Sequence, residues 1–192
     1  MLDSIDRGKL MQLANRIIDS EEQVKIATLS DELTISQVVK FFERQGRNFT
    51  KTMIQNYVRV GVLPPPLEKR NYTKNHLVLL ALIDELKAIY SLEEIKTVLV
   101  PIRNNPDIFD DDIIETTDIY KNYLTMRREA LLKWKESLPE LLDRINLTLG
   151  EDGVKEGERG TAAAFMATLT VMAETIAMRD LANLLMKEYI KK

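Results

Sequence analysis

Hydrophobic and polar positions alternate with a helical period over most of the chain. Apolar residues recur three and four positions apart in residues 35–43 and again in 50–60, and a polar loop at 45–49 separates the two segments. Two short helices joined by such a loop have the spacing of a helix-turn-helix. Thr50 is placed to cap the start of the second helix, and Gly61 to end it.

Two further helices are predicted after a run of three prolines. One begins near Thr73, and the other covers residues 92–99, where Ser91 and Glu94 match a capping box. Residues 1–34 contain one amphipathic helix, which we expect to pack on the helix-turn-helix. The pattern predicts an all-α fold with at most a small wing.

The second half of the chain predicts a helical hairpin. A first helix is expected over about 118–149, where Pro139 either kinks it or divides it in two. A polar loop with four glycines follows, and Thr161 can cap a last helix that extends to about residue 189. This last helix is apolar on more than one face, so a neighbour must cover it. Its methionines favour adaptable core packing over an effector pocket.

A segment rich in proline and acidic residues separates the two halves. We expect a helix-turn-helix domain at 1–100, an acidic linker at 101–117, and a helical dimerisation or effector region at 118–192. The acidic cluster lacks the ligand spacing and central glycine of a calcium loop, which favours a solvated linker over a metal site. Its members are Asp107, Asp110, Asp111, Asp112, Glu115 and Asp118.

The second helix of the helix-turn-helix divides into an apolar face and a polar face. Met53, Ile54, Tyr57 and Val58 can face a core at helical spacing. The remaining side chains project outward and suit phosphates and base edges. They are Lys51, Thr52, Gln55, Asn56 and Arg59.

These residues resemble the MerR-type transcriptional regulators, whose pattern runs Thr-Ile-Arg-Tyr-Tyr-Glu-x-x-Gly-Leu-Leu, then prolines, a basic wing ending in Arg-x-Tyr, and two helices. The matching run here is MIQNYVRVGVLPPP at 53–66, and the resemblance covers about residues 35–99. The chain looks closer still to an uncharacterised bacterial branch of that superfamily, a domain of unknown function. The matching positions are Ile54, Tyr57, Arg59, Gly61, Leu63, Arg70, Tyr72, Leu92, Glu94 and Ile95.

The resemblance implies DNA binding through the second helix and the wing. It places Thr52, Gln55 and Asn56 near bases, and Lys51, Arg59, Lys69, Arg70 and Tyr72 on the DNA backbone. It also implies a homodimer formed through the C-terminal helices. Two positions depart from the family: Gln55 replaces an arginine and Asn56 a tyrosine. The wing is also shorter than usual, so affinity and sequence choice are expected to differ.

The charge distribution favours a nucleic-acid partner for one part of the chain only. The whole chain has a net charge of −3, but residues 40–76 contain eight basic and two acidic residues, a net charge of +6. The remainder therefore has a net charge of −9. A basic module in an acidic chain is typical of a DNA-binding domain, because neutralising phosphates releases counterions.

Composition argues against several other classes of protein. There is no cysteine, which excludes disulfides and thiolate metal sensing, and the lone His76 is expected at a surface or capping position rather than in catalysis. No phosphate loop or zinc motif occurs, so we expect no enzyme, resident cofactor or metal. With no signal-peptide pattern and no uncharged apolar run of about 20 residues, we expect a cytoplasmic protein.

The sequence therefore predicts a sequence-specific regulator that binds double-stranded DNA as a homodimer. A protein-interaction adaptor that keeps the winged-helix fold without strong DNA binding is the alternative. The two hypotheses differ in whether the basic residues form one face. The operator, any small-molecule effector and the direction of regulation are left open.

Overall fold

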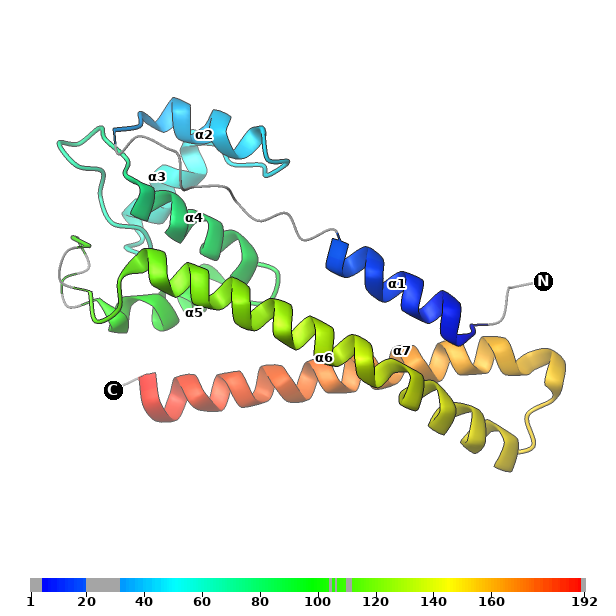
Figure 1. The fold of residues 1–192 in the computed structure, drawn as a ribbon. Helices are drawn as coiled ribbons and strands as arrows, with labels where there is room; N and C mark the ends of the chain where they lie inside the picture. The colour runs from blue at the N-terminus through cyan, green and yellow to red at the C-terminus, as the bar shows by residue number, and fades with distance from the viewer. Residues whose placement is uncertain (1–4, 20–31, 104, 106, 110–111, 191–192) are drawn as a thin grey trace. The chain divides into compact units, whose positions relative to one another are not determined.

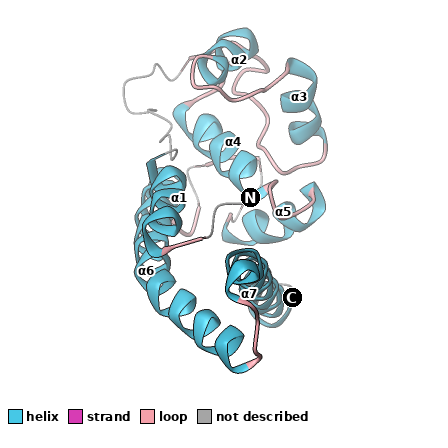
Figure 2. Cartoon of the chain, turned by 90° about the vertical axis from the view of Figure 1, so that its right-hand side faces the viewer, coloured by secondary structure: helices cyan, strands magenta, loops and turns pink. Residues whose placement is uncertain are grey.

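The computed structural model describes residues 5–19, 32–103, 105, 107–109 and 112–190 (Figure 1). In these residues β pairing is limited to three isolated bridges, and no strand is drawn (Figure 2). The all-α prediction is confirmed. The helices are α1 (Arg7–Asp19), α2 (Ile35–Glu43), α3 (Lys51–Arg59), α4 (Lys74–Leu86), α5 (Leu92–Leu99), the 3-10 turn η1 (Val100–Ile102), α6 (Thr116–Glu151), α7 (Glu156–Leu185) and the π-helical turn η2 (Met186–Ile190).

The chain forms two compact units. The helix-turn-helix unit comprises Glu22–Leu124 with Met186–Lys192, and the hairpin unit comprises Met1–Glu21 with Thr125–Leu185. The start of α6 belongs to the first unit and the rest of α6 to the second. This division differs from the expected boundaries at residues 100 and 117, because each unit recruits a segment from the other end of the chain.

Helix α4 occupies the middle of the helix-turn-helix unit. Both views place it between α2 and α3 on one side and α5 on the other (Figures 1 and 2). Eight consecutive residues of α4, from His76 to Ile83, are buried, and they pack with Phe42, Ile54 and Ile95 in one core. A helix that is buried on every side needs neighbours all round, and the short helices provide them.

The local signals for helix ends predicted this unit well. Helices α2 and α5 have the predicted bounds. The Thr50 hydroxyl accepts a hydrogen bond from the Met53 N–H at 3.1 Å. At α5 the Glu94 carboxylate accepts from the Ser91 N–H at 2.8 Å and the Ser91 hydroxyl accepts from the Glu94 N–H at 3.4 Å, so the predicted capping box is complete.

The segment after α5 is more structured than a solvated linker. Arg103 is buried and pairs through its backbone with Asp112, and the Phe109 ring lies edge-on to His76 with centroids 4.8 Å apart. Asp110 and Asp111 of the acidic cluster lie outside the described residues. The described acidic residues Asp107, Glu115 and Asp118 are exposed, whereas Arg103 and Phe109 of the same segment pack inward.

The hairpin unit contains two long helices and a short connection. Pro139 does not divide α6, which is continuous across it. The loop is shorter than predicted: Gly153 adopts a positive φ of 70°, but Gly157 and Gly160 lie inside α7. Thr161 is consequently a helix-interior residue, and its predicted capping role was wrong.

Small residues bring the two long helices together. Leu138, Leu142 and Ile145 of α6 are buried against Ala163 and Ala167 of α7. An alanine contact surface lets two helix backbones approach closely, which suits a tight hairpin.

Helix α1 belongs to this hairpin core and not to the helix-turn-helix, where it was expected. Ala14 is fully buried in the hairpin core, and Ile5 and Leu10 pack against it. Arg7 forms an ion pair with Asp143 of α6. The apolar residues Leu13 and Ile17, which suggested a wide apolar face, remain about half exposed.

The last helix is unusually apolar for its exposure. By length and composition alone, the helix Glu156–Ile190 could cross a membrane, since its most apolar window has a mean hydropathy of 1.4. Length and composition do not separate such a span from a core helix of a water-soluble protein. One of its faces packs on α6, and most of its large apolar side chains are uncovered.

Candidate nucleic-acid interface

Helix α3 is held by its apolar face, which fixes the direction of its polar face. Ile54 and Tyr57 are buried, and Met53 and Val58 pack against the same core. The helix ends at Gly61, whose φ of +76° is a backbone conformation that side chains with a Cβ rarely adopt. The Val62 N–H then donates to the Tyr57 carbonyl at 3.0 Å and closes the turn.

The opposite face of α3 is open to solvent, as the sequence predicted. Lys51, Thr52, Gln55 and Arg59 are exposed. Asn56 is half-buried, and its Oδ1 accepts a hydrogen bond of 2.6 Å from Arg59 Nη2. The guanidinium of Arg59 therefore lies along its own helix, and one acceptor of Asn56 is already occupied.

A tight turn follows the proline run, at the place where the wing was predicted. Leu67 and Asn71 pair through two backbone hydrogen bonds of 2.8 Å, and Glu68 and Lys69 between them have φ values of 50° and 64°. Two successive positive φ values define a turn that favours asparagine and glycine. This sequence uses two charged residues there instead, which exposes Lys69 and, next to it, Arg70.

Tyr72 has a different place from the one predicted. Only 4% of it is exposed, burial raises the pKa of its hydroxyl, and its backbone pairs with Leu33 in both directions. Its ring lies edge-on to His76. Tyr72 is thus a core residue that joins the chain before α2 to the wing. Its burial does not fit the predicted contact with the DNA backbone, which needs an exposed side chain.

His76 is fully buried, contrary to the expected surface position, but it does have a capping role. Its Nδ1 accepts a hydrogen bond from the Thr73 N–H at 3.0 Å, in the place that Glu or Gln takes in a capping box. Its Nε2 lies 3.2 Å from the Pro65 carbonyl oxygen and donates to it, which requires the Nε2–H tautomer. The imidazole therefore joins the start of α4 to the proline run that leads into the wing.

The basic residues of this unit do not all share one role. The Arg47 side chain is largely buried, and its guanidinium forms ion pairs with Asp84 at 3.0 Å and Glu85 at 2.6 Å. Arg47 therefore stabilises the core. The basic side chains that stay exposed are Lys40, Arg44, Lys51, Lys69 and Arg70.

One basic residue was missed by sequence reasoning. The Lys96 amine lies 3.4 Å from the position that a Cβ would take at Gly61. It adds positive charge where α3 ends. No local motif marks Lys96, since α5 brings it there from 35 positions along the chain.

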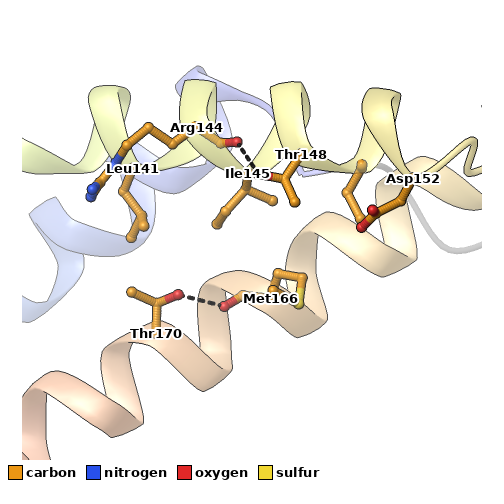
Figure 3. Close-up of a pocket in the computed structure, with 8 residues that line it drawn as sticks. Leu141, Arg144, Ile145, Thr148, Asp152, Met166 and Thr170 are labelled. Atoms are coloured by element: carbon orange, nitrogen blue, oxygen red, sulfur yellow. Dashed lines mark hydrogen bonds between the residues drawn. The ribbon is translucent and has the colours of Figure 1, made fainter.

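A cavity of about 350 Å³ opens in the hairpin unit between α6 and α7 (Figure 3). Leu141, Ile145 and Met166 give it an apolar wall. The hydroxyl groups of Thr148 and Thr170 donate to the carbonyl oxygens of Arg144 and Met166, four residues earlier in each helix. Besides these satisfied hydroxyl groups, Arg144 and Asp152 line the cavity.

A protein-family model matches about half of the sequence. The family described as "Domain of unknown function (DUF1836)" matches residues 24–123. The chain belongs to this family. The matched range agrees closely with the helix-turn-helix unit, including the segment after α5 and the start of α6. No curated protein and no solved structure matches the chain.

Within the DUF1836 domain, His76 is expected to make stability depend on pH. Burial lowers its pKa from 6.5 to about 4, against the opposing effect of hydrogen bonds to the proline carbonyls. As the pH falls, the unfolded chain takes up a proton before the folded chain does. The contribution of neutral His76 to the free energy of unfolding is therefore complete above pH 6.5 and is lost as the pH falls towards 4. We expect a loss of about 2 kcal/mol between pH 7.5 and pH 5.

Urea unfolding of the wild type and of His76→Gln at several pH values measures this loss. Glutamine keeps a capping acceptor and an amide donor but does not titrate, so its pH dependence should be nearly flat over the same range. An equal pH dependence in both proteins would contradict a buried neutral imidazole.

The wing turn is expected to be strained by its side chains. Glu68→Asn should stabilise the protein by about 0.5 to 1 kcal/mol, because asparagine adopts positive φ more readily than glutamate. Glu68→Gln is the matched control, since it removes the same charge without that preference. Denaturation midpoints compare the three proteins, and an equal gain in both variants would make charge the cause instead.

Proposed function

We propose that this protein is a sequence-specific regulator of transcription that binds double-stranded DNA as a homodimer through a MerR-like winged helix-turn-helix. The observation that carries the proposal is the polar face of α3. It is exposed, basic at both ends, and fixed in direction by the burial of Ile54 and Tyr57 on the other side. Exposed polar residues on a rigid helix suit recognition better than they suit core packing.

The dimensions of α3 fit a major groove. An α-helix with its side chains is about 10 to 12 Å across, and the groove of B-DNA is about 12 Å wide. In that position Thr52 and Gln55 offer donors and acceptors to base edges. The amide nitrogen of Asn56 is still able to donate, although its oxygen is bonded to Arg59.

The remaining basic residues are proposed to hold phosphates. Lys51 and Arg59 mark the two ends of α3, and the turn at Glu68 and Lys69 holds the wing away from the core. Lys96 extends this set beyond the residues predicted from the sequence. Phosphate contacts supply affinity and register, whereas base contacts supply sequence choice.

The proposal includes a cytoplasmic protein that needs no resident cofactor or metal and is not an enzyme. Dimerisation would occur through the C-terminal helices, and a twofold dimer implies a pseudo-palindromic operator. A small-molecule effector is left open.

The adaptor hypothesis is favoured by one feature of the same surface. Arg59 is bonded to Asn56, Arg70 lies 3.8 Å from the Glu68 carboxylate, and Arg47 is engaged in the core. These contacts reduce the charge available to phosphates below the net +6 of the segment. DNA binding that is absent even at low salt would select the adaptor.

The double variant Arg59→Ala, Arg70→Ala tests the phosphate contacts. It should bind every duplex more weakly, and the slope of log K against log salt should fall by about 4, because the dimer loses two contacts in each protomer and each lost contact releases about one counterion fewer. Fluorescence anisotropy over a series of salt concentrations measures both quantities. An unchanged slope would contradict these two assignments.

Three single variants separate the proposed roles. Arg47→Ala removes a charge that is already paired with Asp84 and Glu85, and Arg128→Ala removes a charge of the hairpin unit, so neither should alter the salt slope. Gln55→Ala should keep the slope but change the sequences that are selected from a random pool, because Gln55 is proposed to contact bases.

A further inference from the structure

Four segments of the helix-turn-helix unit surround a second cavity, of about 330 Å³. They are the start of the wing turn, the first turn of α4, the segment after α5 and the first turn of α6. Small-molecule sites in proteins range from roughly 300 to 1,000 Å³, so this cavity can hold a compact organic molecule. None of the described residues that line it belongs to α3. We call it the α4 cavity.

Three large apolar side chains line the α4 cavity. They are Leu67, Ile108 and Phe109. Leu67 remains 50% exposed and Ile108 41% exposed, whereas Phe109 packs partly against the core. Covering apolar surface that lines a hollow and still meets water is favourable. These side chains therefore suit the apolar part of a ligand.

Groups that can donate hydrogen bonds line the same cavity. In the described part of the chain, the carboxamide of Asn75 and the hydroxyl of Thr117 have no hydrogen-bond partner. Lys74 also lines the cavity, and no acidic side chain does so among the described residues. Ammonium, amide and hydroxyl groups can all donate to a carboxylate, so the polar part of the lining suits a negatively charged group.

Hydrogen bonds and a ring contact hold the lining segments in place. The Nδ1 atom of His76 accepts from both the N–H and the hydroxyl of Thr73, at 3.0 and 2.9 Å. The Phe109 ring lies edge-on to His76, and the backbone of Leu67 pairs with that of Asn71. The cavity is therefore formed before a ligand arrives, and binding does not carry the cost of ordering these segments.

The apolar and polar parts of the lining together define one class of ligand. We propose that the α4 cavity binds a small amphipathic carboxylate. Its charged group accepts hydrogen bonds from Lys74, Asn75 and Thr117, and its apolar group covers the three apolar side chains. This inference goes beyond the proposed function, because neither the DNA contacts nor the dimer contacts proposed above use this cavity.

A probe with one carboxylate and one apolar group tests the proposal. Phenylacetate has about ten non-hydrogen atoms, and a ligand of that size is expected to bind with a dissociation constant of roughly 1 mM. NMR titration of the isotope-labelled full chain should give saturable shifts of the backbone amides of residues 67, 74–75, 108–109 and 117. Phenylacetamide keeps the shape without the charge, and acetate keeps the charge without the ring, so each should bind at least about tenfold more weakly.

Two matched substitutions locate the site. Ile108→Glu places a negative charge at the cavity and should weaken phenylacetate binding about tenfold, because like charges at short range repel each other. Ile113→Glu is the control, because Ile113 is an exposed isoleucine of the same segment that does not line the cavity. This control should bind the probe nearly as the wild type does. Circular dichroism checks that both variants keep their helices.

The outcomes distinguish this proposal from the proposed function, because the titration contains no DNA. Saturable shifts confined to other residues, or no saturable shift by about 20 mM phenylacetate, overturn the site. Equal affinity for phenylacetamide overturns the assignment of a carboxylate, and equal weakening by both substitutions overturns the location. A chain that binds phenylacetate in the α4 cavity but fails to bind duplex DNA at low salt supports the cavity site and removes the proposed function.

Discussion

The constraint on which the helix-turn-helix unit of this protein depends is the complete burial of α4. From His76 to Ile83 every side chain is enclosed, so α4 cannot exist as an amphipathic surface helix. It must be surrounded by α2, α3, α5 and the start of α6. Burial of large apolar side chains contributes about 1.5 to 3 kcal/mol each, which makes this core the main source of the unit's stability.

The same burial determines what the surface can offer. Packing Ile54 and Tyr57 onto the core leaves Gln55 pointing to solvent, since adjacent residues of a helix cannot share a face. His76 extends the constraint to the wing, because its ring bonds the Pro65 carbonyl while capping α4 through Thr73. A single buried imidazole thus links the core to the segment that holds Lys69 and Arg70.

The two halves of the chain use apolar surface differently. In the helix-turn-helix unit nearly all large apolar side chains of α4 are covered, whereas α7 covers one face with alanine contacts and exposes another. The first unit therefore covers its own core, whereas the second leaves apolar surface of α7 exposed. The family match ends near the same boundary, at residue 123.

Local signals in the sequence predicted most helix ends, because caps depend on a few adjacent residues. Thr50, Gly61 and the pair of Ser91 and Glu94 all have the expected places.

Contacts between distant segments were not predictable in this way. The burial of His76 and Tyr72, the ion pairs of Arg47, and the packing of α1 on the hairpin depend on tertiary neighbours that no local pattern reveals. The exposed face of α3 was predictable from helical periodicity. The ion pairs that hold Arg47 in the core and the position of Lys96 near Gly61 were not.

The most direct test of the central claim is amide hydrogen exchange of the full chain with and without duplex DNA at low salt. The account expects added protection in residues 50–60 and 67–71, where α3 and the wing would meet the duplex, and none in residues 165–176 of α7. Protection confined to α6 and α7, or no change at any DNA concentration, would contradict it.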